Sequence, residues 1–274
     1  MRYRAFLGAL CAFCLAAVTV FSGSALAVPK GLSYDDIVNT GLANKCPEVS
    51  QSVRGSIPLE SGKSYQLASL CIEPTEYFVK QAPTSKRAEA KFVEGKALTR
   101  YTSSLDEVFG DLQRNSDGTL TFVEQGGIDF QAITVLLPAG EEYPFMFTVK
   151  GLKAKTSEPA TSINTSTTFE GNYRVPSYRT SNFLDPKARG LTTGYDSAVA
   201  IPSMADDESI RKENVKKFIS GDGTMALLID RVDNSTGEVG GIFEAVQPSD
   251  TDMGGKAAVD VKIRGVFYGI VEEA

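Results

Sequence analysis

The clearest pattern of apolar and polar positions lies near the C-terminus of the chain. Residues 259–264 read V-D-V-K-I-R, so each apolar residue is followed by a charged one. A β-strand turns successive side chains to opposite faces, and strict alternation is therefore typical of a strand with one buried face and one solvated face. We predict such a strand here.

Turn sequences separate several further pairs of apolar segments. These turns lie at 114–118, 138–140 and 233–237 and are rich in Gly, Asn, Asp and Pro. Each predicts a hairpin between two antiparallel strands. Because each turn joins its two strands directly, with no helical pattern between them, the sequence predicts an all-β fold, either a barrel or a sandwich. A barrel is favoured, since closure removes exposed strand edges.

Two short segments have helical periodicity instead. Ser33 and Asp36 form a capping pattern at the start of residues 34–44, where apolar residues recur every three or four positions. Residues 210–219 follow three acids and carry Lys216 and Lys217 in their last turn, which suits the helix dipole. We expect two short surface helices.

The first 27 residues have the features of an export signal. Arg2 and Arg4 precede an apolar run, and Ala25-Leu26-Ala27 matches a signal-peptidase site. We therefore expect residues 1–27 to be removed and residues 28–274 to form a single domain. Loss of the two arginines would change the formal net charge of the chain from −6 to −8. Nucleic acid is an unsuitable partner for so acidic a chain.

Two cysteines remain after cleavage, Cys46 and Cys71. An isolated pair in an exported chain most simply forms one disulfide. Closing this loop would stabilise the fold by about 3.5 kcal/mol in the chain-entropy description. Two buried thiols are the alternative.

The composition argues against catalysis. The chain has no His, which removes the commonest general base and metal ligand, and no Trp, which sugar-binding clefts favour. No phosphate-binding loop, dinucleotide motif or nucleophile elbow is present. Paired acids occur in several places, among them Glu141 and Glu142 at a predicted hairpin tip. We expect a protein that is not an enzyme.

A locally positive stretch stands out against the acidic background. Residues 173–196 contain Arg174, Arg179, Lys187 and Arg189, and Pro176 and Pro186 disfavour a long helix or a central strand there. The stretch reads either as an ordered insertion that presents cations to a partner, or as a long loop packed on its own domain. The residues alone leave both readings open.

Several long motifs are spread over the mature chain. They are L-S-Y-D-D-I-V-N-T-G-L-A-N-K-C-P at 32–47, G-G-I-D-F at 126–130, P-F-M-F-T-V-K at 144–150, V-P-S-Y-R at 175–179, N-F-L-D-P-K-A-R-G at 182–190, G-Y-D at 194–196, Q-P-S-D-T-D-M-G at 247–254 and V-K-I-R-G-V-F-Y at 261–268. In this order, and over essentially the whole mature chain, they resemble the manganese-stabilising protein family, the extrinsic lumenal subunits of photosystem II.

The resemblance implies an antiparallel eight-stranded β-barrel with a large extended head insertion at about 172–219 and a Cys46–Cys71 disulfide. It also implies a thylakoid-lumen protein, peripheral to the membrane, that caps the manganese-calcium cluster without ligating it and helps to retain calcium and chloride. The partners would be reaction-centre and inner antenna proteins and other extrinsic subunits. The implied contact residues are Tyr34, Asp35, Arg179, Asp185, Lys187 and Arg189. A proton or hydrogen-bond network would use Asp185, Asp250 and Asp252.

Some family members bind calcium with acids and a His. This chain lacks the His, although Glu141 remains a candidate calcium ligand. The competing hypothesis is a periplasmic β-barrel that binds or hydrolyses a small ligand.

Overall fold

The computed structural model describes residues 44–49, 55–83, 89–98, 103–176, 221–250 and 257–274. Every regular element in these ranges is a β-strand. The strands are β1 (Ser56–Pro58), β2 (Tyr65–Gln81), β3 (Lys91–Ala97), β4 (Leu105–Arg114), β5 (Leu120–Ile128), β6 (Phe130–Leu136), β7 (Glu142–Thr148), β8 (Lys153–Thr156), β9 (Ser162–Asn164), β10 (Thr168–Val175), β11 (Gly221–Asp233), β12 (Glu238–Pro248) and β13 (Asp260–Glu273).

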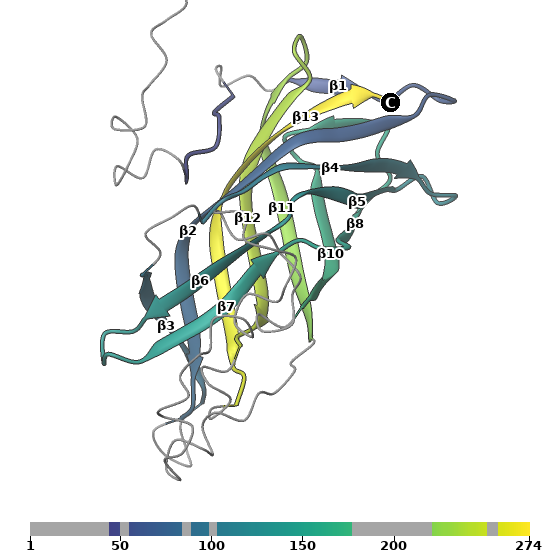
Figure 1. The fold of residues 1–274 in the computed structure, drawn as a ribbon. Coiled ribbons are helices and arrows are strands. Elements are labelled where there is room, and N and C mark those ends of the chain that lie inside the picture. Colours follow the sequence, from purple (N-terminus) through teal and green to yellow (C-terminus); the bar gives the residue numbers. More distant parts are fainter. Residues whose placement is uncertain (1–43, 50–54, 84–88, 99–102, 177–220, 251–256) are drawn as a thin grey trace, which may run out of the picture. The chain divides into compact units, whose positions relative to one another are not determined.

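Eight of these strands form a closed antiparallel ring (Figure 1). Its order is β13-β12-β11-β10-β8-β5-β4-β2, and β2 pairs with β13 to close it. The prediction of an eight-stranded β-barrel is therefore confirmed. Closure pairs both edges of every ring strand, so the barrel itself has no free edge.

The local predictions that led to this fold are confirmed as well. The three turn sequences join β4 to β5, β6 to β7 and β11 to β12. In β13, Val261 and Ile263 are buried, while Lys262 and Arg264 lie at least partly in solvent.

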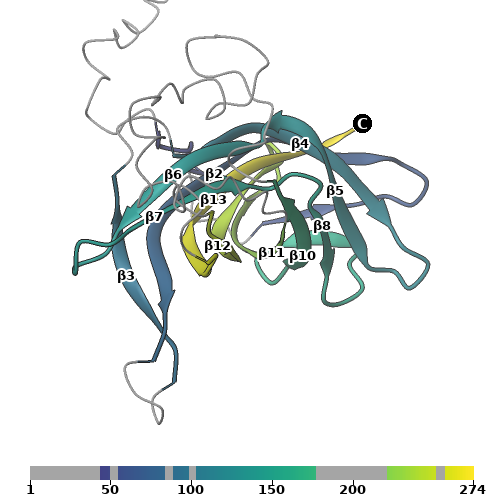
Figure 2. The ribbon, with the colours of Figure 1, turned by 60° about the horizontal axis from the view of Figure 1, so that its bottom comes forward.

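Five strands lie outside the ring. β3, β6 and β7 extend the sheet from β2 and gather on one side of the barrel (Figure 2). β1 and β9 form a separate two-stranded sheet. β7 contributes to the core from outside the ring, because Phe145 and Phe147 are fully buried. Phe147 stacks on Phe243 of β12, with ring centroids 5.9 Å apart.

The interior of the barrel is filled by side chains. One continuous cluster of buried apolar residues includes Phe122, Phe169 and Phe267. A cavity of about 10 Å³ lies among the apolar side chains there, which is about the space that one water molecule needs. The described part of the barrel thus forms a packed core and offers no interior room for a small-molecule ligand.

One boundary differs from the sequence-based expectation. β10 continues to Val175 and pairs with β11 through its last residue, so Asn172–Val175 belong to the barrel and not to the head insertion. Pro176 follows the last residue of β10 directly, so its ring does not interrupt the strand. The remainder of the predicted insertion, the signal segment and both predicted helices lie outside the described residues, except for Asn44 and Pro176 at their ends.

Candidate functional site

The chain leaves the barrel for residues 176–220 between two neighbouring strands. Val175, the last residue of β10, faces Gly221, the first residue of β11, in the antiparallel register. Both ends of this long connection are therefore held side by side by the sheet itself. We call this end of the barrel, where β10 and β12 end and β11 and β13 begin, the insertion end.

A buried hydrogen-bond chain locks the insertion end. The Tyr173 hydroxyl donates to Gln247 Oε1 (3.1 Å), and Gln247 Nε2 donates to the Met146 carbonyl (2.6 Å). This chain ties β10 to β12 and β12 to β7. Burial raises the pKa of the Tyr173 hydroxyl far above its ordinary value, so the group remains a donor. Gly223 makes room for the ring, because a Cβ at that position would overlap Tyr173.

The loop between β12 and β13 is fastened at the same end. Ser249 N donates to Val259 O (2.7 Å), and Val259 N donates to Ser249 Oγ (3.0 Å). Asp250 is buried, and its backbone N–H donates to Pro144 O (2.9 Å). The backbone of Asp250 is therefore fixed against β7, at the start of the loop that also contains Asp252.

A group of charged residues joins the insertion end to β5. The buried Asp129 carboxylate accepts a bond from Lys150 Nζ (2.9 Å), and the Lys150 carbonyl accepts one from Arg174 N (3.0 Å). Glu124 accepts a bond from Gly151 N (2.7 Å). Burial raises the pKa of Glu124, and the nearby Asp129 charge acts in the same direction. In this group Asp129 is paired with Lys150, whereas Glu124 has a raised pKa and binds a proton more readily than usual.

The N-terminal segment is attached to the outside of the barrel at several points. The predicted Cys46–Cys71 disulfide is present and joins the segment to β2. Beside it, the buried Glu73 carboxylate accepts bonds from Lys45 Nζ (2.6 Å) and Cys46 N (2.9 Å). Asn44 Oδ1 accepts a bond from Ser103 N (2.7 Å), just before β4. Residues 44–46 are thus held across the outer side of β2, from the disulfide to the start of β4.

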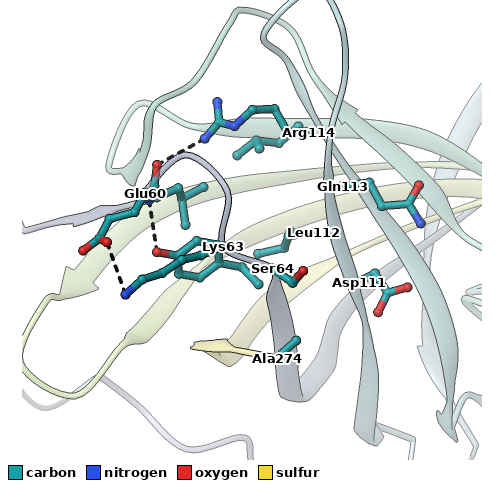
Figure 3. Close-up of a pocket in the computed structure, with 11 residues that line it drawn as sticks. Glu60, Lys63, Ser64, Asp111, Leu112, Gln113, Arg114 and Ala274 are labelled. Atoms are coloured by element: carbon teal, nitrogen blue, oxygen red, sulfur yellow. Dashed lines mark hydrogen bonds and ion pairs between the residues drawn. The ribbon is translucent and has the colours of Figure 1, made fainter.

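The opposite end of the barrel holds a cavity of about 330 Å³ (Figure 3). Its charged groups bond within the chain. Lys63 pairs with Glu60 and Glu273, which raises the pKa of Lys63. Arg114 donates to the carbonyls of Leu59 (3.3 Å) and Ala160 (2.9 Å). These bonds hold β1 and the C-terminus against this end of the barrel. Because Lys63 and Arg114 are already paired within the chain, the insertion end is the stronger candidate site.

Most of the site residues predicted from the sequence lie outside the described ranges. These are Tyr34, Asp35, Arg179, Asp185, Lys187, Arg189 and Asp252. Asp250 stands at the insertion end, as described above. Glu141 lies exposed in the turn between β6 and β7, and no group of three or more potential metal-ligating side chains gathers within the described ranges. None of the described elements is a helix that could cross a bilayer.

The sequence did not point to Glu73, Asp129 or Gln247 as structural anchors. Glu73 follows a run of apolar residues in β2, and an acid in such a run is a signal that a partner must accompany it. Asp129 and Gln247 lie within longer motifs, and nothing in their spacing identifies their partners.

Comparison with known proteins places the chain in a family. A sequence profile described as "Manganese-stabilising protein / photosystem II polypeptide" matches residues 30–271. The chain belongs to the manganese-stabilising protein family. Among its relatives is the photosystem II extrinsic protein O of Synechococcus elongatus, which is 66% identical over 100% of this chain and 99% of that protein.

More distant members match over almost the same length. The photosystem II extrinsic protein O of Crocosphaera subtropica is 55% identical over 99% of this chain and 98% of its own. The chloroplastic oxygen-evolving enhancer protein 1 of Volvox carteri is 42% identical over 96% of this chain and 88% of its own. The family consists of non-catalytic extrinsic subunits, so the expectation that this protein is not an enzyme is confirmed.

Proposed function

We propose that this protein docks on the lumenal face of photosystem II, where it caps and stabilises the manganese-calcium cluster without supplying its ligands. The proposal rests on the family match over residues 30–271. The filled barrel supports it, because a packed core suits a rigid support better than a ligand carrier. The proposed location is the thylakoid lumen, after export directed by residues 1–27.

Two segments of the chain would make the main contacts, and both are rooted in rigid parts of the barrel. The head insertion would present Arg179, Lys187 and Arg189 from the insertion end, with Asp185 beside them. Guanidinium groups can clamp carboxylates or carbonyls with two parallel bonds, and lysine adds a compact charge. The proposed recipients are reaction-centre and inner antenna proteins, and other extrinsic subunits would contact the same assembly.

The N-terminal motif would make the second contact through Tyr34 and Asp35. Its base is fixed by the disulfide and by the bonds of Asn44 and Glu73. Fixing both roots in one rigid body reduces the conformational entropy lost when the two segments bind together.

Retention of ions and movement of protons complete the proposal. Asp250 is fixed at the insertion end, and with Asp185 and Asp252 it would form a chain of carboxylates able to pass protons outward from the cluster. Capping would also slow the escape of calcium and chloride. Glu141 is the proposed residue for a weak calcium contact, since its carboxylate is exposed and carboxylate oxygen suits calcium.

Reconstitution tests the proposal. Photosystem II from which the extrinsic subunit has been washed with salt is mixed with the purified mature chain, and oxygen evolution is read at low chloride. We expect the chain to restore activity, and salt to weaken its binding. The double variant Lys187→Glu, Arg189→Glu should bind at least about tenfold more weakly, because like charges would face the partner.

A matched control uses two exposed lysines at the opposite end of the barrel, Lys63 and Lys155, changed together to Glu. Each makes only surface ion pairs, which contribute little to stability. This control should bind like the wild type. Equal, salt-independent binding by wild type and the Lys187/Arg189 variant would contradict the proposed contacts. A purely periplasmic pool that does not cofractionate with photosystem II would favour the ligand-binding alternative.

A further inference from the structure

An apolar patch lies exposed on the outer wall of the barrel, on β4 and β5. Phe109 is 44% exposed and Ile128 is 51% exposed. In the register, Phe109 faces Gly126 and Ile128 faces Asp106. Gly126 leaves room for the Phe109 ring, because a Cβ at position 126 would stand only 3.3 Å from Phe109 Cε1. Two large apolar side chains thus stand in solvent on neighbouring strands.

The backbone beneath the patch is irregular. Glu107 has a φ of +52°, a left-handed conformation that residues other than Gly rarely adopt. Opposite it, Gly127 has a φ of +127°, and a Cβ there would overlap Glu107 O and Val108 Cα. The pairing shifts register twice between Asp106 and Gly110. As a result, Asp106 and Glu107 are both exposed. Such strain and bulges recur where a surface has a function beyond folding.

The charged side chains that β4 and β5 place along this wall are acidic. Residues 103–113 and 120–129 contain no Lys or Arg, and they contain Asp106, Glu107, Asp111, Glu124 and Asp129. Lys150 lies at one border of this wall, where it pairs with Asp129 (2.9 Å), and Lys153 faces Val123 further along β5; Asp106 and Glu107 beside the apolar side chains have no Lys or Arg partner among the ion pairs of the described residues. An apolar patch bordered by acids complements a partner segment that carries an apolar side chain beside Arg or Lys.

The patch also lies between the places where the two proposed contact segments join the barrel, the N-terminal segment at Asn44 and the insertion end. On one side, Ser103, three residues before Asp106, holds Asn44 of the N-terminal segment (2.7 Å). On the other, Asp129 follows Ile128 directly and binds Lys150, whose carbonyl accepts a bond from Arg174 near the end of β10. The wall is therefore continuous with both proposed contacts.

We propose that this wall, formed by Asp106, Glu107, Phe109, Gly126 and Ile128 and here called the β4–β5 face, is a third docking surface, which binds a basic and apolar lumenal segment of the photosystem II core. The inference rests on the proposed function. It adds the barrel wall to the interface and specifies the chemistry of the segment that covers it.

A second exposed apolar row provides the matched control. Leu228, Ile242 and Val266 are register neighbours on the outer face of β11, β12 and β13. Ile242 and Val266 line a pocket together with Lys45–Val49 of the N-terminal segment, so Leu228, which is 39% exposed, is the control position. Next to this row, Glu244 and Arg264 pair with each other (2.7 Å). The charges there cancel, so the row offers the same apolar exposure without the acidic border.

The test is rebinding of the mature chain to salt-washed photosystem II, with the dissociation constant measured by titration. Phe109→Ser and Ile128→Ser should each raise the Kd about tenfold, as expected for a buried apolar contact. Leu228→Ser should leave the Kd within about twofold of wild type. Asp106→Lys should raise the Kd and reduce its dependence on salt. Thermal unfolding of each variant is measured in parallel, and similar melting temperatures ensure that binding is compared between folded proteins.

A photo-crosslinking side chain placed at position 109 identifies the partner. A crosslink to a basic lumenal segment of a core subunit supports the proposal. A crosslink to a second copy of this chain or to another extrinsic subunit overturns it. If the wild type binds and restores oxygen evolution while both Ser variants bind within about twofold of it, the β4–β5 face is not a docking surface but the proposed function stands. If the wild type itself fails to bind, the proposed function fails first.

Discussion

Replacing Tyr173 with Phe tests how firmly the insertion end is built. The change removes one hydroxyl and leaves the ring in place. Gln247 is 1% exposed, so its Oε1 would lose the Tyr173 donor (3.1 Å) in a place that water does not reach easily. Its Nε2 would still donate to Met146 O (2.6 Å). The variant therefore leaves a buried acceptor without its partner.

The expected loss follows from that geometry. A net hydrogen bond contributes about 1 kcal/mol, and leaving its partner buried and unsatisfied costs about 1–3 kcal/mol. We take about 2 kcal/mol for Tyr173→Phe. For a domain of this size each kcal/mol lowers the melting temperature by about 2–4 °C, so the variant should melt about 4–8 °C below wild type, as followed by circular dichroism.

The same substitution at Tyr268 is the control. The Tyr268 hydroxyl donates to Glu238 Oε1 (2.7 Å), but Glu238 is partly exposed and water can replace the lost donor. Tyr268→Phe should therefore cost less than about 1 kcal/mol. Equal melting temperatures for wild type and Tyr173→Phe, or a larger loss at Tyr268, would refute the account of a locked insertion end.

Two further predictions concern stability. Changing Cys46 and Cys71 together to Ser removes the disulfide between residues 25 positions apart. The free energy of unfolding should fall by about 3.5 kcal/mol and the melting temperature by about 7–14 °C. A loss under about 1 kcal/mol would show that the hydrogen bonds of Glu73 hold the N-terminal segment without the disulfide. Glu124→Gln should change the pH dependence of unfolding. The pKa of Glu124 is raised above 4.5 in the folded protein, so the native state binds this proton more readily than the unfolded chain. Wild-type stability therefore falls as the pH rises through the raised pKa. The melting temperature of Glu124→Gln relative to wild type should therefore be higher at about pH 7 than at about pH 4, and a constant difference would contradict the assigned shift.

Local patterns predicted the strands where one face meets solvent. In β13 the alternation is strict, and the turn residues at 114–118 and 233–237 fix the neighbouring hairpins. The sequence of β7 shows no such alternation of apolar and charged residues. Phe145, Met146, Phe147 and Thr148 are all buried, because one face of this strand enters the core while the other is covered as well. A continuous buried run carries no period from which its neighbours can be inferred.

The long-range polar contacts could not be predicted from a single sequence. Tyr173 and Gln247 are separated by 74 positions and meet only because β10, β11 and β12 lie side by side. Glu73 and Lys45 meet because the disulfide brings the N-terminal segment to β2. Likewise, the strained conformation of Glu107 has no sequence signal, since Gly127 opposite it explains the bulge only once the two strands are paired.

The most direct test of the account is a cryo-EM map of photosystem II with this chain rebound. We predict that Asn44, Phe109 and the insertion root at Val175 face the complex, and that Ala274 and the cavity of Figure 3 face the solvent of the lumen. A map in which the cavity end contacts the complex while the insertion root and the β4–β5 face lie in solvent would contradict it.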